Sequence, residues 1–289
     1  MPSWFATPYT IHMKKLYAAL LVLTVAALLI SAAAFQRSHQ PKAYLGFDRN
    51  DYPGDENLPA LRKTFAFTGY WLNNPPGANA NSWRGKREMV QRAGFGFLLL
   101  FNGRAYAQLK SAPNPGAADG VAAAIAAKAE GFRKGSVIFL DQEEGGRMLN
   151  EQKQYVFAWA DAVMQAGYRP GIYCSGIEIP EEAGGFISTA RDLHDSPGGR
   201  ELVFWVANDA CPPSPGCALP GVPPPERSGA PFAEVWQFAQ SPLRRQIAAA
   251  CAQSYNPDGN CYPPGNGVEP KLHLDVNSAR TADPSHARQ

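Results

Sequence analysis

The sequence is poor in charge and contains no concentrated basic segment. Charged residues make up 18% of the 289 residues, below the roughly 25% of an average globular protein. The net charge is only +2. Without a stripe of lysine and arginine, the chain lacks the electrostatic signature of a nucleic-acid binder. We therefore predict no nucleic-acid partner.

Motifs of several enzyme classes are also missing. No G-x-G-x-x-G motif follows an early strand, and no G-x-S-x-G motif is present, which disfavours a dinucleotide-binding enzyme and an esterase. The five histidines form no H-x-H or H-x-x-x-H pair, and the five cysteines form no C-x-x-C pair. A zinc or iron centre is therefore disfavoured, as is an unrelated metal-dependent hydrolase. We predict no cofactor and no metal; an oxygen-coordinated ion among Asp48, Asp141 and Asp275 is the alternative.

The first 34 residues have the pattern of an export signal. Two lysines follow Met13, and an uncharged apolar run of 20 residues leads to small residues at 32–34. A basic region, an apolar region and a small-residue cleavage site are typical of a secretory signal peptide. About 20 apolar residues can also span a bilayer, so an uncleaved anchor is the alternative. We expect Met13 to be the true start, 35–42 to be a linker, and the protein to be secreted, periplasmic or tethered to the outer face of the inner membrane.

The remaining 255 residues alternate between predicted strands and helices. Their number is close to the roughly 250 residues of a (β/α)8 barrel. Most of the strand-length runs are continuously apolar, which is typical of parallel strands covered on both faces. We therefore predict an α/β fold, a (β/α)8-type TIM barrel over 43–279, and favour it over an open doubly wound sheet. The eight predicted strands are 44–48, 65–72, 95–102, 137–143, 171–175, 202–208, 234–239 and 272–276.

The connections predict an irregular barrel, with helices missing or shortened in its C-terminal half. Good helices are expected after a cap at Asp119, over 151–166 and over 243–254. The segment 211–231 is rich in proline and leaves no room for a regular helix. It is either a lid over the site or a rigid surface excursion. Residues 280–289 are expected to be a flexible tail.

The cysteines fit an oxidising compartment. Cys211 and Cys217 flank a short proline-rich turn, and Cys251 and Cys261 flank a ten-residue loop. Two local disulfides are therefore plausible, although their connectivity cannot be deduced from the sequence. Cys174 lies inside an apolar run, and we expect it to be a lone buried thiol in the core.

Acidic residues gather where the predicted strands end. Asp48 ends the first strand, Asp141 and Glu143 end the fourth, and Asp275 lies near the end of the eighth. Side chains two residues apart on a strand share a face, so Asp141 and Glu143 point the same way. Crowded carboxylates raise one another's pKa, which leaves one protonated beside one ionised, the pair that glycosidic-bond cleavage requires. Helix caps and loop ion pairs are the simpler explanation of each acid taken alone.

The order of the motifs resembles the glycoside hydrolase family 25 barrel. The motifs are GFDR, FLDQEEG, GYRPGIYCSG, FWVAND, EVWQFA and LHLDVN, and they span 43–279. The chain is closer still to the bacterial glycoside-hydrolase-like domain of unknown function that is related to that family. The resemblance implies a barrel that acts on the amino-sugar glycan of bacterial cell walls, or that descends from enzymes that do so.

The resemblance also implies roles for individual residues. Glu143 would be the general acid, and Asp141 would orient the acetamido group of the substrate or stabilise the positive intermediate. Asp48 and Asp275 would help to set the charge and geometry of these two acids. Residues that would bind the sugar include the aromatic–glutamine pair on the seventh strand and aromatic side chains on other strands, although core packing is the ordinary role of a buried aromatic. They are Tyr70, Tyr173, Trp205, Trp236, Gln237 and Asn277.

The sequence departs from the family lysozymes in ways that leave catalysis open. Glu144 directly follows Glu143, and Gly145 and Gly146 come next. Glu144 has the opposite parity and should point away, unless a bulge exchanges the two acids. The leading hypothesis is an exported glycoside hydrolase of the muramidase type. The alternative is a catalytically inactive barrel that binds cell-envelope polysaccharide or serves as a scaffold, because a fold alone does not establish chemistry.

Overall fold

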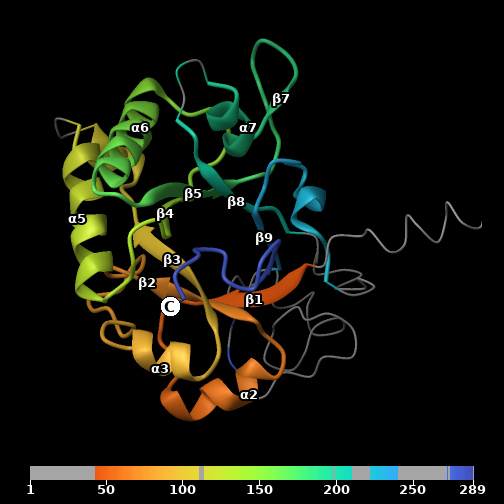
Figure 1. Cartoon of the computed structure of the whole chain (residues 1–289). Coiled ribbons are helices and arrows are strands. Elements are labelled where there is room, and N and C mark those ends of the chain that lie inside the picture. Colours follow the sequence, from red (N-terminus) through yellow and green to blue (C-terminus); the bar gives the residue numbers. More distant parts are fainter. Residues whose placement is uncertain are drawn as a thin grey trace, which may run out of the picture. The chain divides into compact units, whose positions relative to one another are not determined.

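The strands form a closed barrel (Figure 1). The computed structural model describes residues 43–110, 114–196, 198, 200–209, 222–239, 272 and 274–288, all within the compact unit Ala43–Gln289. In these residues eight strands close the barrel in the order β1-β10-β9-β8-β5-β4-β3-β2, which confirms the predicted α/β, TIM-like fold. Their bounds are β1 Tyr44–Asp48, β2 Phe67–Trp71, β3 Gly96–Asn102, β4 Val137–Gln142, β5 Arg169–Ser175, β8 Val203–Ala207, β9 Val235–Ala239 and β10 Asp275–Ala279.

The last strand runs against the others, which corrects the prediction of an all-parallel barrel. β10 pairs antiparallel with both β1 and β9, whereas the other pairs in the barrel are parallel. The predicted strand 272–276 would end near Asp275, but β10 begins there. Because the direction is reversed, Asp275 lies opposite Asp48, the last residue of β1. Asp275 therefore lies at the predicted end of the barrel, although its strand runs in the direction opposite to the predicted one.

Helices cover the barrel unevenly. Figure 1 shows α5 and α6 side by side on one flank. Gly116 and Gly120 of α5 lie against backbone carbonyls of α6, where a Cβ would collide, so these glycines permit the close packing. Elsewhere the helices are short. The elements outside the barrel are η1 Asp55–Asn57, α2 Leu58–Arg62, α3 Arg87–Arg92, α4 Tyr106–Leu109, α5 Gly116–Ala129, α6 Asn150–Gln165, β6 Ile179–Pro180, β7 Phe186–Ile187, α7 Thr189–His194 and η2 Pro225–Ser228.

Asp119 does not cap its helix, which is a second correction. α5 begins at Gly116, so Asp119 lies in the first turn rather than before it. Its carboxylate pairs with Arg104, with Nε and Oδ2 2.6 Å apart, and accepts a hydrogen bond from the Tyr155 hydroxyl of α6. The acid therefore joins α5 to the loop after β3 and to α6. A carboxylate in the first helical turn is also favourable for the helix dipole.

Glycines inside the strands make room for the large side chains that fill the barrel. A Cβ at Gly46 would meet the ring of Phe67, and one at Gly171 would meet the ring of Phe139. The interior is consequently packed with aromatic rings rather than open, as expected of small barrels. At Gly69 a Cβ would meet Asp48, so this glycine faces the interior close to the acidic end.

The C-terminal segment closes the end of the barrel where the parallel strands begin, which we call the base. The Asp283 Oδ1 atom accepts from the Phe97 amide at 2.8 Å, and the Ser285 Oγ atom accepts from the Leu99 amide at 2.8 Å. The Val137 amide donates to the Ser285 carbonyl, and the Ser285 side chain is fully buried. The prediction of a flexible tail over 280–289 is therefore wrong for residues 280–288.

Several predictions lie outside the described residues. They are the signal or anchor at 1–34, the linker at 35–42, the helix at 243–254, both proposed disulfides and most of the proline-rich segment. Among the residues that the structure does describe, no helix is long and apolar enough to cross a membrane. Cys174 is a buried free thiol, as predicted.

Candidate functional site

Four acidic residues meet at the end of the barrel opposite the base, which we call the mouth. Asp48 ends β1, Asp141 is the fifth residue of β4, Glu143 directly follows β4, and Asp275 begins β10. Burial raises the pKa of the Tyr173 hydroxyl, and the charges of all four carboxylates raise it further, so all of them lie within electrostatic reach of one side chain. The sequence parity argument predicted this convergence.

Asp48 is buried but well provided with hydrogen bonds. Its side chain is 7% exposed, and Oδ1 accepts from Asn277 Nδ2 at 2.6 Å and from Gln237 Nε2 at 3.1 Å. Burial raises the pKa of Asp48 to about 6, the two amide donors lower it, and the charge of Glu143 raises it again. Burial is the larger effect because removing a carboxylate from water penalises its charged form.

Asp141 is buried without equivalent support. It is 5% exposed, and its Oδ1 atom has no hydrogen-bond partner within the described part of the chain. Burial, followed by the charges of Glu143 and Asp48, holds the pKa of Asp141 well above its ordinary value. An orphaned polar atom in a folded protein costs free energy. Burial and neighbouring charge therefore favour the protonated form of Asp141, and its position has no evident structural benefit.

Glu143 and Glu144 differ in environment. Glu143 is exposed at the mouth, while Glu144 accepts hydrogen bonds from the Tyr106 amide and from Gln152 Nε2. Gln152 also accepts from the Leu149 amide at the start of α6. Glu144 thus fastens the loop after β4 to α4 and α6, and Glu143 is left free to face solvent.

Two aromatic side chains fix the amides that hold Asp48. The Tyr173 hydroxyl donates to Gln237 Oε1 at 2.7 Å, and Trp205 Nε1 donates to Asn277 Oδ1 at 2.9 Å. With their oxygens accepting, both amides must present their NH2 groups elsewhere, and each donates to Asp48. The rings of Tyr173 and Trp205 also pack together, with centroids 4.5 Å apart. These residues position Asp48, and Trp205 is too buried, at 1% exposure, to offer a face to a sugar.

Two predicted sugar-binding residues do not reach the mouth. Tyr70 points outward, where its hydroxyl donates to Glu130 and its ring packs on Trp83. Trp236 also points outward, and its Nε1 donates to the Asn208 carbonyl at 2.7 Å. Each follows or precedes an inward-facing residue on its strand, so alternation turns it away. The predicted roles of Tyr70 and Trp236 are therefore corrected, and both are packing residues.

Trp71 is the mouth residue that the sequence analysis missed. It ends β2, shares the inward face with Gly69, and donates from Nε1 to the Arg49 carbonyl at 3.1 Å. Its ring is 3% exposed. The signal for it is Gly69 itself, since a glycine within a strand marks the side where another group approaches closely. In this strand that side is the interior next to Asp48.

The chemistry available at the mouth is that of acids. Within the described residues, no group of three or more histidine, cysteine, aspartate or glutamate side chains could hold a metal ion. A buried carboxyl group with a raised pKa, near an exposed carboxyl group, can transfer a proton or stabilise developing positive charge. This arrangement suits acid-assisted cleavage of a glycosidic bond.

Comparison with known proteins identifies a family and a similar fold. Residues 66–210 match the model of the Rv2525c-like, glycoside hydrolase-like domain. The spore cortex lytic enzyme SleM of Clostridium perfringens has a similar fold, with a TM-score of 0.50, 15% identity, and coverage of 83% of this chain and 68% of that chain.

Two further solved structures match over most of their length. An uncharacterized protein of B. stearothermophilus has a TM-score of 0.48 and 18% identity, and the match covers 82% of this chain and 95% of that chain. The Tat-secreted protein Rv2525c of Mycobacterium tuberculosis, in complex with L-tartrate, has a TM-score of 0.48 and 11% identity, and the match covers 83% of this chain and 96% of that chain. At these identities the likeness concerns the fold. The search of curated proteins gave no match.

Proposed function

Because this chain belongs to the family of Rv2525c-like, glycoside hydrolase-like domains, we propose that it hydrolyses the glycan of bacterial cell walls as a muramidase. The observation that carries the proposal is Asp141, a buried carboxyl group with an orphaned oxygen beside Glu143 and Asp48. A protein that used this end of the barrel only for packing would gain stability by replacing that acid. The presence of an unsatisfied, buried acid at this position supports a role in chemistry.

In this proposal Glu143 is the general acid. It is the exposed acid of the pair on β4, so it is accessible to the oxygen of a glycosidic bond. Protonation of that oxygen lets the bond to the anomeric carbon break as positive charge develops on the sugar ring. Asp141 assists, either by orienting the acetamido group with its acidic proton or, once ionised, by stabilising the positive charge.

Asp48 and Asp275 set the electrostatics of the two central acids. Asp48 raises the pKa of Asp141 through its charge, and Asn277 and Gln237 keep Asp48 in place. Since the pKa of Asp48 is about 6, its charge and its influence on Asp141 change between acidic and neutral pH. Tyr173 orients Gln237 and so acts as a positioning residue.

The substrate proposed here lies outside the inner membrane. We assign residues 1–34 to a signal peptide or anchor and 35–42 to a linker, on the basis of the basic, apolar and small-residue pattern. The secreted, periplasmic or membrane-tethered protein would then meet cell-wall glycan directly. This location also suits the two disulfides proposed from the cysteine spacing.

The test is the release of fragments from purified bacterial cell walls. The full chain is compared with Glu143→Gln, and Glu182→Gln, an exposed glutamate of the β6–β7 hairpin, is the matched control. We expect new reducing ends from the parent and the control and none from Glu143→Gln. A fully active Glu143→Gln protein would refute the assignment of the acid. Glycan binding by the folded parent without fragment release would instead support the inactive polysaccharide-binding barrel.

A further inference from the structure

The base of the barrel holds a pocket that is remote from the acids of the mouth. Its volume is about 420 Å³, and it is lined by the residues with which β4, β5 and β8 begin, together with the C-terminal segment. Ligand pockets commonly have volumes of about 300–1,000 Å³. The pocket is therefore large enough for a small organic molecule, and the proposed glycan chemistry does not use it.

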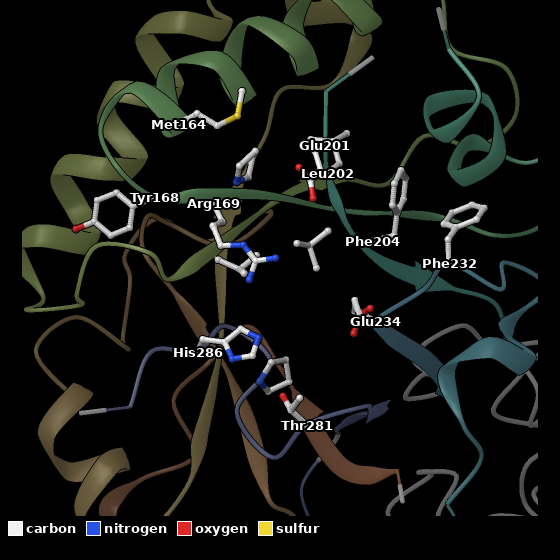
Figure 2. Close-up of a pocket in the computed structure, with 14 residues that line it drawn as sticks. Met164, Tyr168, Arg169, Glu201, Leu202, Phe204, Phe232, Glu234, Thr281 and His286 are labelled. Carbon is white, nitrogen blue, oxygen red and sulfur yellow. The ribbon is translucent and has the colours of Figure 1, made fainter. Parts of the chain in front are cut away.

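Charged side chains of both signs face this pocket. Figure 2 shows Arg169 and His286 on one side, with Glu201 and Glu234 on the other. In the described part of the chain, the side chains of Arg169 and Glu201 form no ion pair with each other or with any other residue. If this wall served only to close the barrel, its opposite charges would be expected to form an ion pair. Held apart, they offer one cationic and one anionic contact to a ligand.

The histidine is held at the pocket by an unusual backbone. His286 has a φ of 50°, and within the described residues it is the one non-glycine residue with positive φ. Its amide donates to the Asp283 carbonyl at 2.8 Å, and its carbonyl accepts from Arg133 Nε at 3.0 Å. Backbone strain of this kind is concentrated at functional sites. Here it directs an exposed imidazole towards the pocket (Figure 2).

The rest of the lining is apolar and firmly packed. Val137 is fully buried and Phe204 is 4% exposed. Phe232 stacks on His194, with ring centroids 3.9 Å apart and planes inclined by 12°. At one edge, the buried Thr281 Oγ1 atom has no hydrogen-bond partner among the described residues. The pocket thus combines an apolar floor, a charged rim and an unused hydroxyl.

We infer that the pocket at the base binds a small zwitterion with an apolar side chain, as in a free amino acid or a dipeptide. Arg169 and His286 bind the carboxylate, for which the planar guanidinium offers paired donors. Glu201 and Glu234 bind the ammonium group, and the partly exposed side chains of Val203 and Phe232 pack against the apolar side chain. Glu234 also contacts Arg280, so Glu201 provides the anionic contact that is free.

The test is calorimetric titration of the full chain with leucyl-alanine at pH 7. The same dipeptide with its amine acetylated and its carboxylate amidated is the ligand control, because it keeps the apolar groups and loses both charges. We expect saturable binding of the free dipeptide at millimolar concentration or below, and at least tenfold weaker binding of the blocked one. Arg169→Gln and Glu201→Gln should each weaken binding of the free dipeptide at least tenfold.

Glu182→Gln is the matched protein control and should bind the dipeptide like the parent. Both pocket residues are exposed and unpaired in the described chain, so their variants should fold, which circular dichroism would check. The absence of binding by the parent, equal binding of the blocked dipeptide, or full binding by both pocket variants would each overturn the inference. Release of cell-wall fragments is expected to be unchanged in both variants, so the outcome here is independent of the proposed function.

Discussion

The two ends of the barrel differ in the hydrogen bonding and burial of their acidic and hydroxyl side chains. At the base, Asp283 and Ser285 accept hydrogen bonds from strand amides that would otherwise lack partners. At the mouth, Asp141 leaves an oxygen orphaned, and burial raises the pKa of both Asp141 and Asp48. Asp283 and Ser285 therefore stabilise the fold, whereas Asp141 and Asp48 reduce its stability at neutral pH.

This contrast distinguishes polar groups that support the fold from those that serve a function, and it does so without comparison with a related protein. Polar groups that serve only the fold are expected to be satisfied, because an unsatisfied one costs about 1–3 kcal/mol. An exception to this rule can be recognised in a single structure, without comparing related sequences. The mouth is the place where carboxylates are crowded and buried despite that cost, and this is the reason for placing the reaction there.

Asp141→Asn should separate activity from folding most clearly. The amide keeps the shape of the side chain but can neither donate an acidic proton nor ionise. We expect fragment release from cell walls to fall at least about 100-fold, the range typical of a lost acid–base group, while the thermal midpoint does not fall. The assay is reducing-end release beside a melting curve. An active variant, or one that unfolds, would remove the distinction between mouth and base.

Asp48→Asn should stabilise the protein at neutral pH. The folded-state pKa of Asp48, about 6, lies above its ordinary value of 3.8. Stability is therefore full below about pH 4 and falls as the pH rises to about 6, because the unfolded chain releases the proton first. Since one pKa unit corresponds to about 1.4 kcal/mol, we expect a gain of up to about 3 kcal/mol at pH 7.

The asparagine can still accept from Asn277 and Gln237, so the hydrogen bonds are retained in this variant. Urea unfolding at pH 4 and at pH 7 measures the effect, and the two proteins should differ little at the lower pH. A loss of stability at pH 7 would mean that the Asp48 carboxylate is a structural group like those of the base.

Asp283→Ala should destabilise the protein by about 1–3 kcal/mol, since the Phe97 amide would lose its acceptor in a partly buried position. Urea unfolding at pH 7 provides the measurement. Glu88→Ala, which removes an exposed pair with Arg92, is the control and should change stability by less than about 1 kcal/mol. If the two substitutions have the same small effect, the C-terminal segment does not secure the base.

Tyr173→Phe should have the smallest effect and act on the mouth indirectly. It removes the donor to Gln237 Oε1, at a cost of about 1 kcal/mol, and frees the amide to rotate. Because the hydrogen bond from Gln237 lowers the pKa of Asp48, that pKa should rise above its parent value of about 6. Carbon-13 NMR titration of the Asp48 carboxyl group would detect the shift; an unchanged pKa would show that Tyr173 does not orient the amide.

The acids of the mouth were predictable because strand parity and the direction of parallel strands are readable locally. The shared orientation of Asp141 and Glu143 could be predicted from the apolar start of β4 and the alternation of its side chains. Asp275 was predicted for the wrong reason, since nothing in the run LHLDVN tells a parallel strand from an antiparallel one. The reversal depends on how the chain returns to β1, which is a property of the whole barrel.

The outward-facing aromatics and the base were not predictable in the same way. Tyr70 and Trp71 are adjacent, and the choice between them depends on which of two faces is the interior. Gly69 indicates which face of β2 is the interior, but this could be recognised only once the interior was known to be filled by side chains. The C-terminal segment reads as a polar end because its partners, Phe97 and Leu99, are 186 residues away in the sequence. Local patterns cannot anticipate contacts at that distance.

Sealing of the base by residues 280–288 also has a consequence for the timing of folding. The amide of Phe97 finds its acceptor, Asp283, 186 residues further along the chain. Contacts between such distant segments form slowly, because a long loop must close before they contribute. The barrel is therefore expected to close late in folding, and a chain truncated before Asp283 is expected to be a substrate for proteases.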